Sequence, residues 1–97
     1  MEIGEKYLPI GTVVMLKNGK KPVMIKGLAV STKADVNLVY DYSAVLYPVG
    51  EVGGTQLAVF NHDQIEKVLF MGYVTEEQKQ LNEKLLKLVG EKRANAK

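Results

Sequence analysis

The chain has 97 residues, of which 46% are hydrophobic and 25% are charged. This length supports one domain, because a second domain would have too little interior of its own. The formal net charge of +2 is too small to indicate a nucleic-acid or membrane partner by charge alone. The absence of cysteine excludes disulfides, thiolate metal sites and cysteine nucleophiles.

The first ten residues, 1–10, are expected to form a lead-in to the fold. They contain two glutamates and no continuous apolar run, which distinguishes them from a secretory signal peptide. The chain also lacks a run of about eighteen apolar residues, the length that a transmembrane helix needs. We therefore expect a cytoplasmic protein without membrane insertion, in which residues 1–97 form a single domain.

A β-hairpin is the strongest local signal. Asn18 and Gly19 stand between two apolar runs, and both residue types tolerate the positive φ that a type I′ turn requires. The pattern predicts that residues 12–16 pair with residues 23–30. Because Pro22 has no amide hydrogen, we expect it at the start or on an edge of the second strand.

Two further strands are expected after a polar connection. The letters VNLVYDYS, residues 36–43, alternate in a way that predicts a strand with Leu38 and Tyr40 on one face and Asp41 on the other. The letters AVLYPVG, directly after them, predict a separate short strand that stops at Pro48. Both assignments depend on the two-residue period of extended chains.

The letters FNHDQ predict one short helical turn near residues 62–66. Asn61 has the side chain preferred at a helix N-cap, and Gln64 lies where its side chain can bond back to the cap. Phe60 and Ile65 have the spacing of a hydrophobic staple around the same turn. We expect a strand to resume after the turn.

His62 is the only histidine, and with Asp63 it forms the pair of residues that most suggests catalysis or metal binding. Neighbouring side chains on a helical turn diverge by about 100°, so these two do not form a hydrogen-bonded pair through sequence proximity. A metal site would need scattered carboxylates such as Asp35, Asp41 or Glu66, which with one histidine make a poor zinc set. We therefore predict that His62 is an exposed first helical residue and that the chain has no metal, cofactor or catalytic residue.

A C-terminal helix is predicted over residues 75–90, followed by a frayed basic tail at 91–97. Thr75 and Gln78 form a second capping box, and Gly90 is expected to end or weaken the helix. One apolar stripe at helical spacing is expected to pack on the sheet: Leu81, Leu85, Leu88 and Val89.

The elements together predict an α+β fold that is mostly β. Residues 11–73 would form a small, strongly bent antiparallel sheet or a partly open barrel of the SH3-like type, with the helix covering one face or an end. The alternative is an open antiparallel sheet with the helix packed across it.

The tyrosines offer the best candidate for a binding surface. Their amphipathic rings lie either in the core or, partly exposed, in a protein-binding face. Six residues are the predicted protein-binding positions: Tyr40, Tyr42, Tyr47, Asn61, His62 and Asp63.

Three functions remain open on the residues alone. The first is a non-enzymatic protein-interaction module. The second is a nucleic-acid-binding small barrel that uses the hairpin lysines, although lysines at turns more often serve solvation: Lys17, Lys20, Lys21 and Lys26. The third, an enzyme centred on His62, requires two carboxylates beside that imidazole. A homo-oligomer through a strand edge or the leucine stripe also stays open.

Three blocks of sequence, taken in order, resemble a known family: YLPIGTVVMLKNGKKPVMI, YDYSAVLYPVGEVG and FNHDQIEKVLFMGY. The family is a small uncharacterised Gram-positive domain of unknown function, and the likeness covers about residues 7–73. Its genes often lie in type VII secretion loci with toxins of the LXG kind. The resemblance implies a cytoplasmic accessory role, as an adaptor, chaperone or targeting factor whose partner is a secreted toxin or its accessory proteins. It brings no catalytic residues.

Overall fold

The computed structural model of the chain describes residues 6–31, 38–50 and 58–95, with side chains up to residue 92. Its strands form one antiparallel sheet in the order β4-β3-β2-β1-β5. The strands are β1 (Val13–Leu16), β2 (Val23–Ser31), β3 (Val39–Leu46), β4 (Ala58–Phe60) and β5 (Ile65–Phe70). A short 3-10 helix, η1 (His62–Gln64), joins β4 to β5, and helix α1 (Glu76–Asn95) ends the chain.

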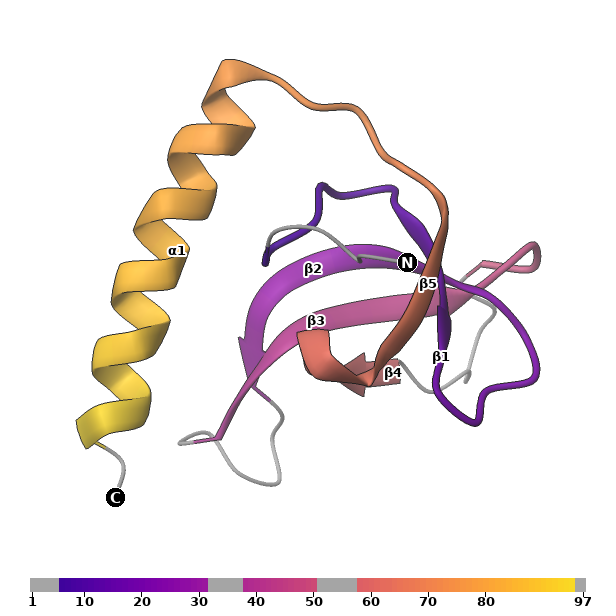
Figure 1. Ribbon diagram of the computed structural model, residues 1–97, viewed down its shortest axis with the longest axis horizontal. Helices are drawn as coiled ribbons and strands as arrows, with labels where there is room; N and C mark the ends of the chain where they lie inside the picture. Colours follow the sequence, from indigo (N-terminus) through magenta and orange to yellow (C-terminus); the bar gives the residue numbers. More distant parts are fainter. Residues whose placement is uncertain (1–5, 32–37, 51–57, 96–97) are drawn as a thin grey trace.

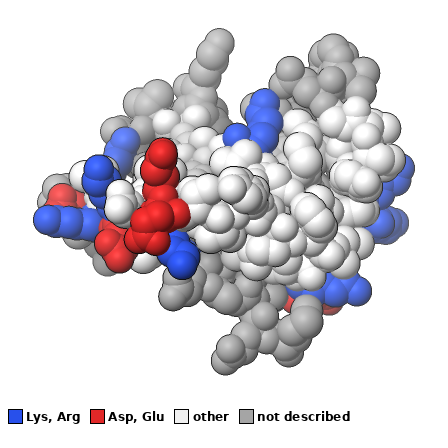
Figure 2. Space-filling view, turned by 90° about the horizontal axis from the view of Figure 1, so that it is seen from above, with Lys and Arg blue, Asp and Glu red and all other residues white. Residues whose placement is uncertain are grey.

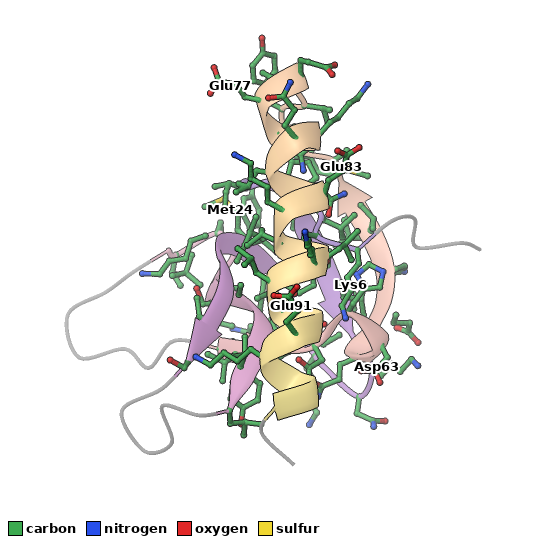
Figure 3. The ribbon with its side chains drawn as sticks, turned by 90° about the vertical axis from the view of Figure 1, so that its left-hand side faces the viewer. Lys6, Met24, Asp63, Glu77, Glu83 and Glu91 are labelled. Carbon is green, nitrogen blue, oxygen red and sulfur yellow. The ribbon has the colours of Figure 1, made fainter. Side chains whose placement is uncertain are left out.

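The sheet is strongly bent and remains open, as predicted, and α1 runs along one side of it (Figure 1). A bulge in β2 contributes to the bend, because the register with β3 shifts between Ile25 and Gly27 and bulges increase the local twist. Gly27 also approaches β3 closely, since a Cβ at this position would collide with the Ser43 hydroxyl. Viewed from the helix side, α1 stands in front of the sheet (Figure 3).

The predicted hairpin is confirmed, with β1 antiparallel to β2 and Pro22 directly before β2. The predicted type I′ turn is wrong. Asn18 has a positive φ of 65°, whereas Gly19 does not adopt a positive φ. The Gly19 N–H donates to the Leu16 carbonyl at 2.9 Å, so the turn is centred one residue earlier than expected.

The region of residues 39–50 differs from the prediction in one respect. β3 is one continuous strand that ends at Leu46, because it pairs with β2 from Val39 to Leu46 and the bulge opposite Ser43 and Ala44 places its extra residue in β2. Leu38 is exposed and Asp41 is buried, in agreement with their predicted positions on opposite faces. Residues 36 and 37 of the predicted strand lie outside the described residues.

The predicted lead-in belongs to the core. Tyr7 and Leu8 are buried and cluster with apolar side chains of all five strands and of α1. The members of this cluster from the strands and the helix are Val14, Val23, Ile25, Val39, Tyr42, Ala44, Phe60, Ile65 and Val89. A segment that lacks periodicity therefore supplies two of the core residues.

Helix α1 begins as predicted but extends further. Gln78 N–H donates to the Thr75 hydroxyl at 3.1 Å, which is the expected N-cap bond. Gly90 lies inside the helix, because one glycine costs only about 1 kcal/mol and the residues after it are good helix formers. Residues 91–95 are therefore helical rather than frayed.

The predicted leucine stripe is only partly the packed face of α1. Val89 is buried and Leu85 is partly buried, whereas Leu81 and Leu88 are exposed. The inward face instead includes Asn82, which precedes Leu85 and Val89 at spacings of three and then four. Leu81 and Leu88 each stand one residue before an inward position, about 100° away around the helix. Among the described residues, no helix has the length and apolar character needed to cross a membrane.

Candidate functional site

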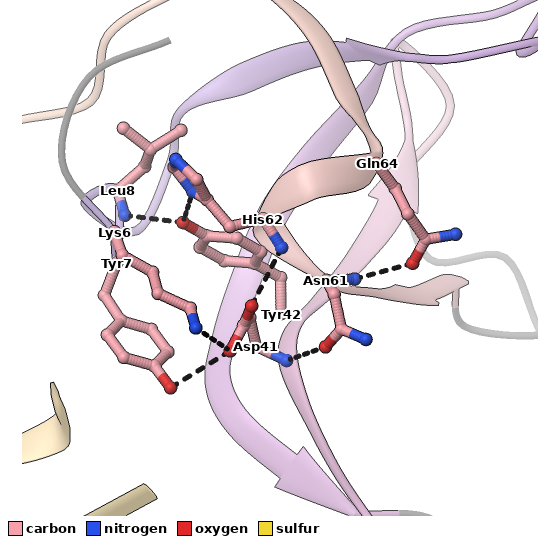
Figure 4. A network of polar contacts seen from close by, with 8 residues as sticks. All are labelled: Lys6, Tyr7, Leu8, Asp41, Tyr42, Asn61, His62 and Gln64. Atoms are coloured by element: carbon pink, nitrogen blue, oxygen red, sulfur yellow. Dashed lines mark hydrogen bonds and ion pairs between the residues drawn. The ribbon is translucent and has the colours of Figure 1, made fainter. Parts of the chain in front are cut away.

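The centre of the polar residues is a buried carboxylate on β3. Asp41 is only 1% exposed, and both of its oxygens have partners (Figure 4). Its Oδ1 accepts the Tyr7 hydroxyl at 3.1 Å and lies 3.4 Å from Lys6 Nζ, while its Oδ2 accepts the backbone N–H of His62 at 2.8 Å. A charge can be buried when it is paired and hydrogen-bonded in this way.

The next residue, Tyr42, forms the second half of the cluster. Its hydroxyl accepts the Leu8 N–H at 3.1 Å and lies 2.7 Å from His62 Nδ1. Because the oxygen already accepts one hydrogen bond, we assign its proton to the bond with Nδ1. This assignment places the proton of the neutral imidazole on Nε2.

Burial sets the protonation of this phenol. The side chain of Tyr42 is fully buried, with its ring centroid 5.3 Å from that of Phe60 and 6.0 Å from that of Tyr7. Desolvation raises the pKa of Tyr42 to about 12; the Leu8 hydrogen bond lowers it and the Asp41 charge raises it further. Tyr42 therefore stays neutral and keeps its hydroxyl proton across the ordinary pH range.

Asn61 connects η1 to β3. Its Oδ1 accepts the Asp41 N–H at 3.0 Å, and its own N–H donates to Gln64 Oε1 at 2.8 Å. The predicted capping box is present, and the staple residues Phe60 and Ile65 are both buried. The predicted role of this stretch, to begin a helical turn between two strands, is confirmed, with the turn spanning only three residues.

The structure brings together half of the six predicted binding residues. Asn61, His62 and Tyr42 surround Asp41, and His62 is half-buried rather than exposed as predicted. Tyr42 is enclosed in the core, so its ring is not part of an exposed face. The other three lie away from the cluster: Tyr40 is half-buried, and Tyr47 and Asp63 are exposed.

Sequence reasoning missed the partners that make this cluster. The sequence pattern places Asp41 on the strand face opposite its neighbouring tyrosines, and it places Tyr7 and Leu8 in the lead-in. A carboxylate between two tyrosines in an otherwise apolar strand is the available signal, because a charge in such a strand needs a partner if it is buried. The sequence gives no sign that this partner is 34 residues away.

The cluster is therefore suited to joining segments of the chain. It joins the N-terminal segment, β3 and η1, and the Asp41 and Tyr42 side chains have no exposed surface to offer a ligand. Among the residues that the structure describes, no group of three His, Cys, Asp or Glu side chains could hold a metal ion.

Comparison with known proteins identifies a family over most of this fold. No curated protein and no solved structure matches the chain. The family described as domain of unknown function DUF4176 matches residues 7–81, from the buried Tyr7 through all five strands to the first turns of α1. The chain therefore belongs to the DUF4176 family.

Proposed function

We propose that this chain is a non-enzymatic protein-interaction module. The observation that supports the proposal is a run of exposed apolar side chains at the end of β5 and in the linker to α1: Leu69, Phe70, Met71, Tyr73 and Val74. Seen from above, this part of the molecule has a broad area without charged side chains (Figure 2). Contiguous exposed apolar surface commonly marks a site of contact with another protein.

The proposed setting is an accessory role in type VII toxin secretion, in the cytoplasm, as an adaptor, chaperone or targeting factor. The resemblance of three sequence blocks to a family with genes beside LXG toxins supports this setting. The partner would be a secreted toxin or one of its accessory proteins. The exposed apolar run fits such a partner because aromatic residues and methionine are enriched at protein interfaces, and tyrosine is enriched among the residues that dominate their energetics.

Co-purification from the native host tests the proposal. The tagged chain is expected to retain a product of a neighbouring gene. Tyr73, which is 85% exposed, can be changed to Asp without disturbing the core, and this variant should retain at least about tenfold less partner. A wild-type chain that retains no neighbouring product would contradict the proposed function.

Tyr47→Asp is the matched control, because Tyr47 is also an exposed tyrosine but follows β3. Unchanged capture by Tyr47→Asp, together with loss in Tyr73→Asp, would assign the contact to the β5 end. The reverse result would instead support the tyrosine face predicted from the sequence.

Nucleic-acid binding is the alternative function, and one observation favours it. Three lysines in the β1–β2 connection are all exposed: Lys17, Lys20 and Lys21. Binding through them should weaken steeply as salt rises, because each phosphate contact releases condensed cations. A flat titration with single-stranded and duplex DNA at low salt would remove this alternative.

A further inference from the structure

An open groove of about 780 Å³ runs beside the first half of α1. Its walls come from the N-terminal segment, the linker after β5 and one side of the helix. Most of its surface is apolar, and the aliphatic residues and the methionine in its lining are Leu8, Pro9, Met71, Val74 and Leu86. Two of these side chains, Met71 and Val74, belong to the exposed run described above.

One polar group in this groove has no partner. Asn82 lines the groove and is only 9% exposed, yet its Oδ1 has no hydrogen bond. Gln78, one turn earlier, differs because its Nε2 donates to the Tyr7 carbonyl at 3.3 Å. An unpaired buried carboxamide destabilises a fold. A ligand group that supplies the missing hydrogen bond would explain why an asparagine stands at this position.

The chemistry of the groove selects the occupant. The Asn82 carboxamide has an acceptor oxygen and a donor NH2 group, which can pair with the N–H and C=O of a peptide backbone, and apolar side chains line the groove beside it. A helical segment has already bonded most of its backbone N–H groups internally, whereas an extended segment keeps them free. An extended chain with apolar side chains therefore matches both features.

The charges at the rim agree with this choice. Lys79 and Glu83 lie one turn apart on the helix edge of the groove, and their charges cancel. Lys6 lines the groove too, on the same side of α1 as Glu83 (Figure 3), but it is paired with Asp41. A rim with balanced charge suits an uncharged segment better than an anionic polymer.

We propose that this groove binds an extended, apolar peptide segment of a protein partner, whose backbone N–H donates to Asn82 Oδ1 once the side chain turns this buried oxygen toward the groove. The assignment rests on the proposed function and names its site. It also fixes the chemistry of the partner: alternating apolar side chains enter the groove, and the backbone is read by one carboxamide.

Selection of a phage-displayed library of random linear peptides on the full chain tests the assignment. Enriched peptides are synthesised and their affinities are measured by fluorescence polarisation against wild type and variants. Asn82→Leu removes the carboxamide and should weaken binding about tenfold, the equivalent of one lost hydrogen bond. Its thermal unfolding should occur at or above the wild-type temperature, which would show that the loss is not a folding defect.

Leu86 and Leu88 provide a matched pair that does not depend on Asn82. Both are exposed on α1, at 46% and 59%, but only Leu86 lines the groove. Leu86→Asp should weaken peptide binding at least about tenfold, and Leu88→Asp should leave it unchanged. Equal affinities in Leu86→Asp and wild type would overturn the assignment, as would a library that yields no binder.

A second copy of the chain is the competing occupant. A dimer of the wild type that Leu86→Asp abolishes in sedimentation equilibrium would overturn the peptide assignment. The co-purification experiment separates this inference from the proposed function. Groove-dependent peptide binding without capture of a neighbouring product contradicts only the function, whereas undiminished capture by Leu86→Asp contradicts only the groove.

Discussion

Two buried polar groups of this fold, Asp41 and Asn82, have opposite surroundings. Asp41 has hydrogen bonds or an ion pair on both oxygens, from two other segments of the chain. Asn82 lies beside an open groove and has an oxygen without a partner. The first arrangement is complete within the chain, and the second is incomplete.

This difference suggests different roles: the Asp41 cluster stabilises the fold, whereas we propose that Asn82 takes part in binding. The residues that most suggest catalysis in the sequence, around His62, belong to the hydrogen-bonded cluster around Asp41. The groove is lined by residues that look ordinary: a linker methionine, a valine and an asparagine within a leucine-rich helix. A buried oxygen without a partner beside an open groove, rather than a reactive residue type, points to the proposed binding site in this molecule.

The largest expected effect comes from removing the carboxylate. Asp41→Leu would leave Lys6, the Tyr7 hydroxyl and the His62 N–H without their acceptor, and breaking a buried pair costs about 3–5 kcal/mol. A domain of this size has roughly 5–10 kcal/mol of stability, so this variant should be largely unfolded in mild urea. Asp41→Asn keeps one acceptor oxygen and should lose about half as much. A loss below about 1 kcal/mol in Asp41→Leu would show that the cluster is not architectural.

Two glycines extend the comparison to the backbone. A Cβ at Gly72 would collide with the Ile10 carbonyl oxygen, whereas a Cβ at Gly90 would meet open space. Gly72→Ala should therefore destabilise the fold by about 2–3 kcal/mol. Gly90→Ala should stabilise it by about 0.5–1 kcal/mol, because alanine favours the helix. Thermal unfolding followed by circular dichroism would measure both, and equal effects would contradict the tight packing of the linker onto the N-terminal segment.

Local signals explain how much of the fold could be predicted. The Asn18-Gly19 hairpin, the capping box at Asn61 and the Thr75 cap each depend on residues within a few positions, and each element appears where expected. The errors arise where distant segments meet. Tyr7 reaches Asp41 across 34 residues, and the inward face of α1 is set by the sheet it covers rather than by its leucines.

The candidate site shows the same limit. Three of the six predicted binding residues do gather in space, because Asn61, His62 and Tyr42 meet around Asp41. The groove could not be predicted, since its walls come from residues near positions 8, 72 and 82. No periodicity in the sequence brings these positions together.

The decrease in the free energy of unfolding at alkaline pH tests the hydrogen-bonded cluster around Asp41 and Tyr42 without a substitution at Asp41. The pKa of Tyr42 is about 12 in the fold, above its ordinary value of 10.0. Because the folded pKa is raised, the stabilisation is fully present below pH 10 and is lost as pH rises from 10 to 12. Two pKa units at 1.36 kcal/mol each give a ceiling of about 2.7 kcal/mol, and screening by water at half-buried neighbours reduces this to about 1–2 kcal/mol.

Tyr42→Phe supplies the control for that measurement. It should lower stability at neutral pH by about 1–3 kcal/mol, because the Leu8 N–H and His62 Nδ1 lose their partner. It should also show a shallower decline of the free energy of unfolding between pH 10 and 12. Parallel alkaline declines in the two proteins would contradict a buried, neutral phenol.

The smallest effect, and the sharpest contrast, is Asn82→Leu. Asp41→Leu destabilises the fold because the donors that bond to Asp41 lose their acceptor. Asn82→Leu leaves no group without a partner and removes an unpaired acceptor. The expected result is a gain of about 1 kcal/mol in the free energy of unfolding, measured in urea. A loss of similar size would mean that Asn82 already has a stabilising role within the chain, and the two buried polar groups would then belong to the same class. A gain that coincides with weaker peptide binding would show that the fold keeps this asparagine at the expense of its own stability, which is the expected signature of a binding residue.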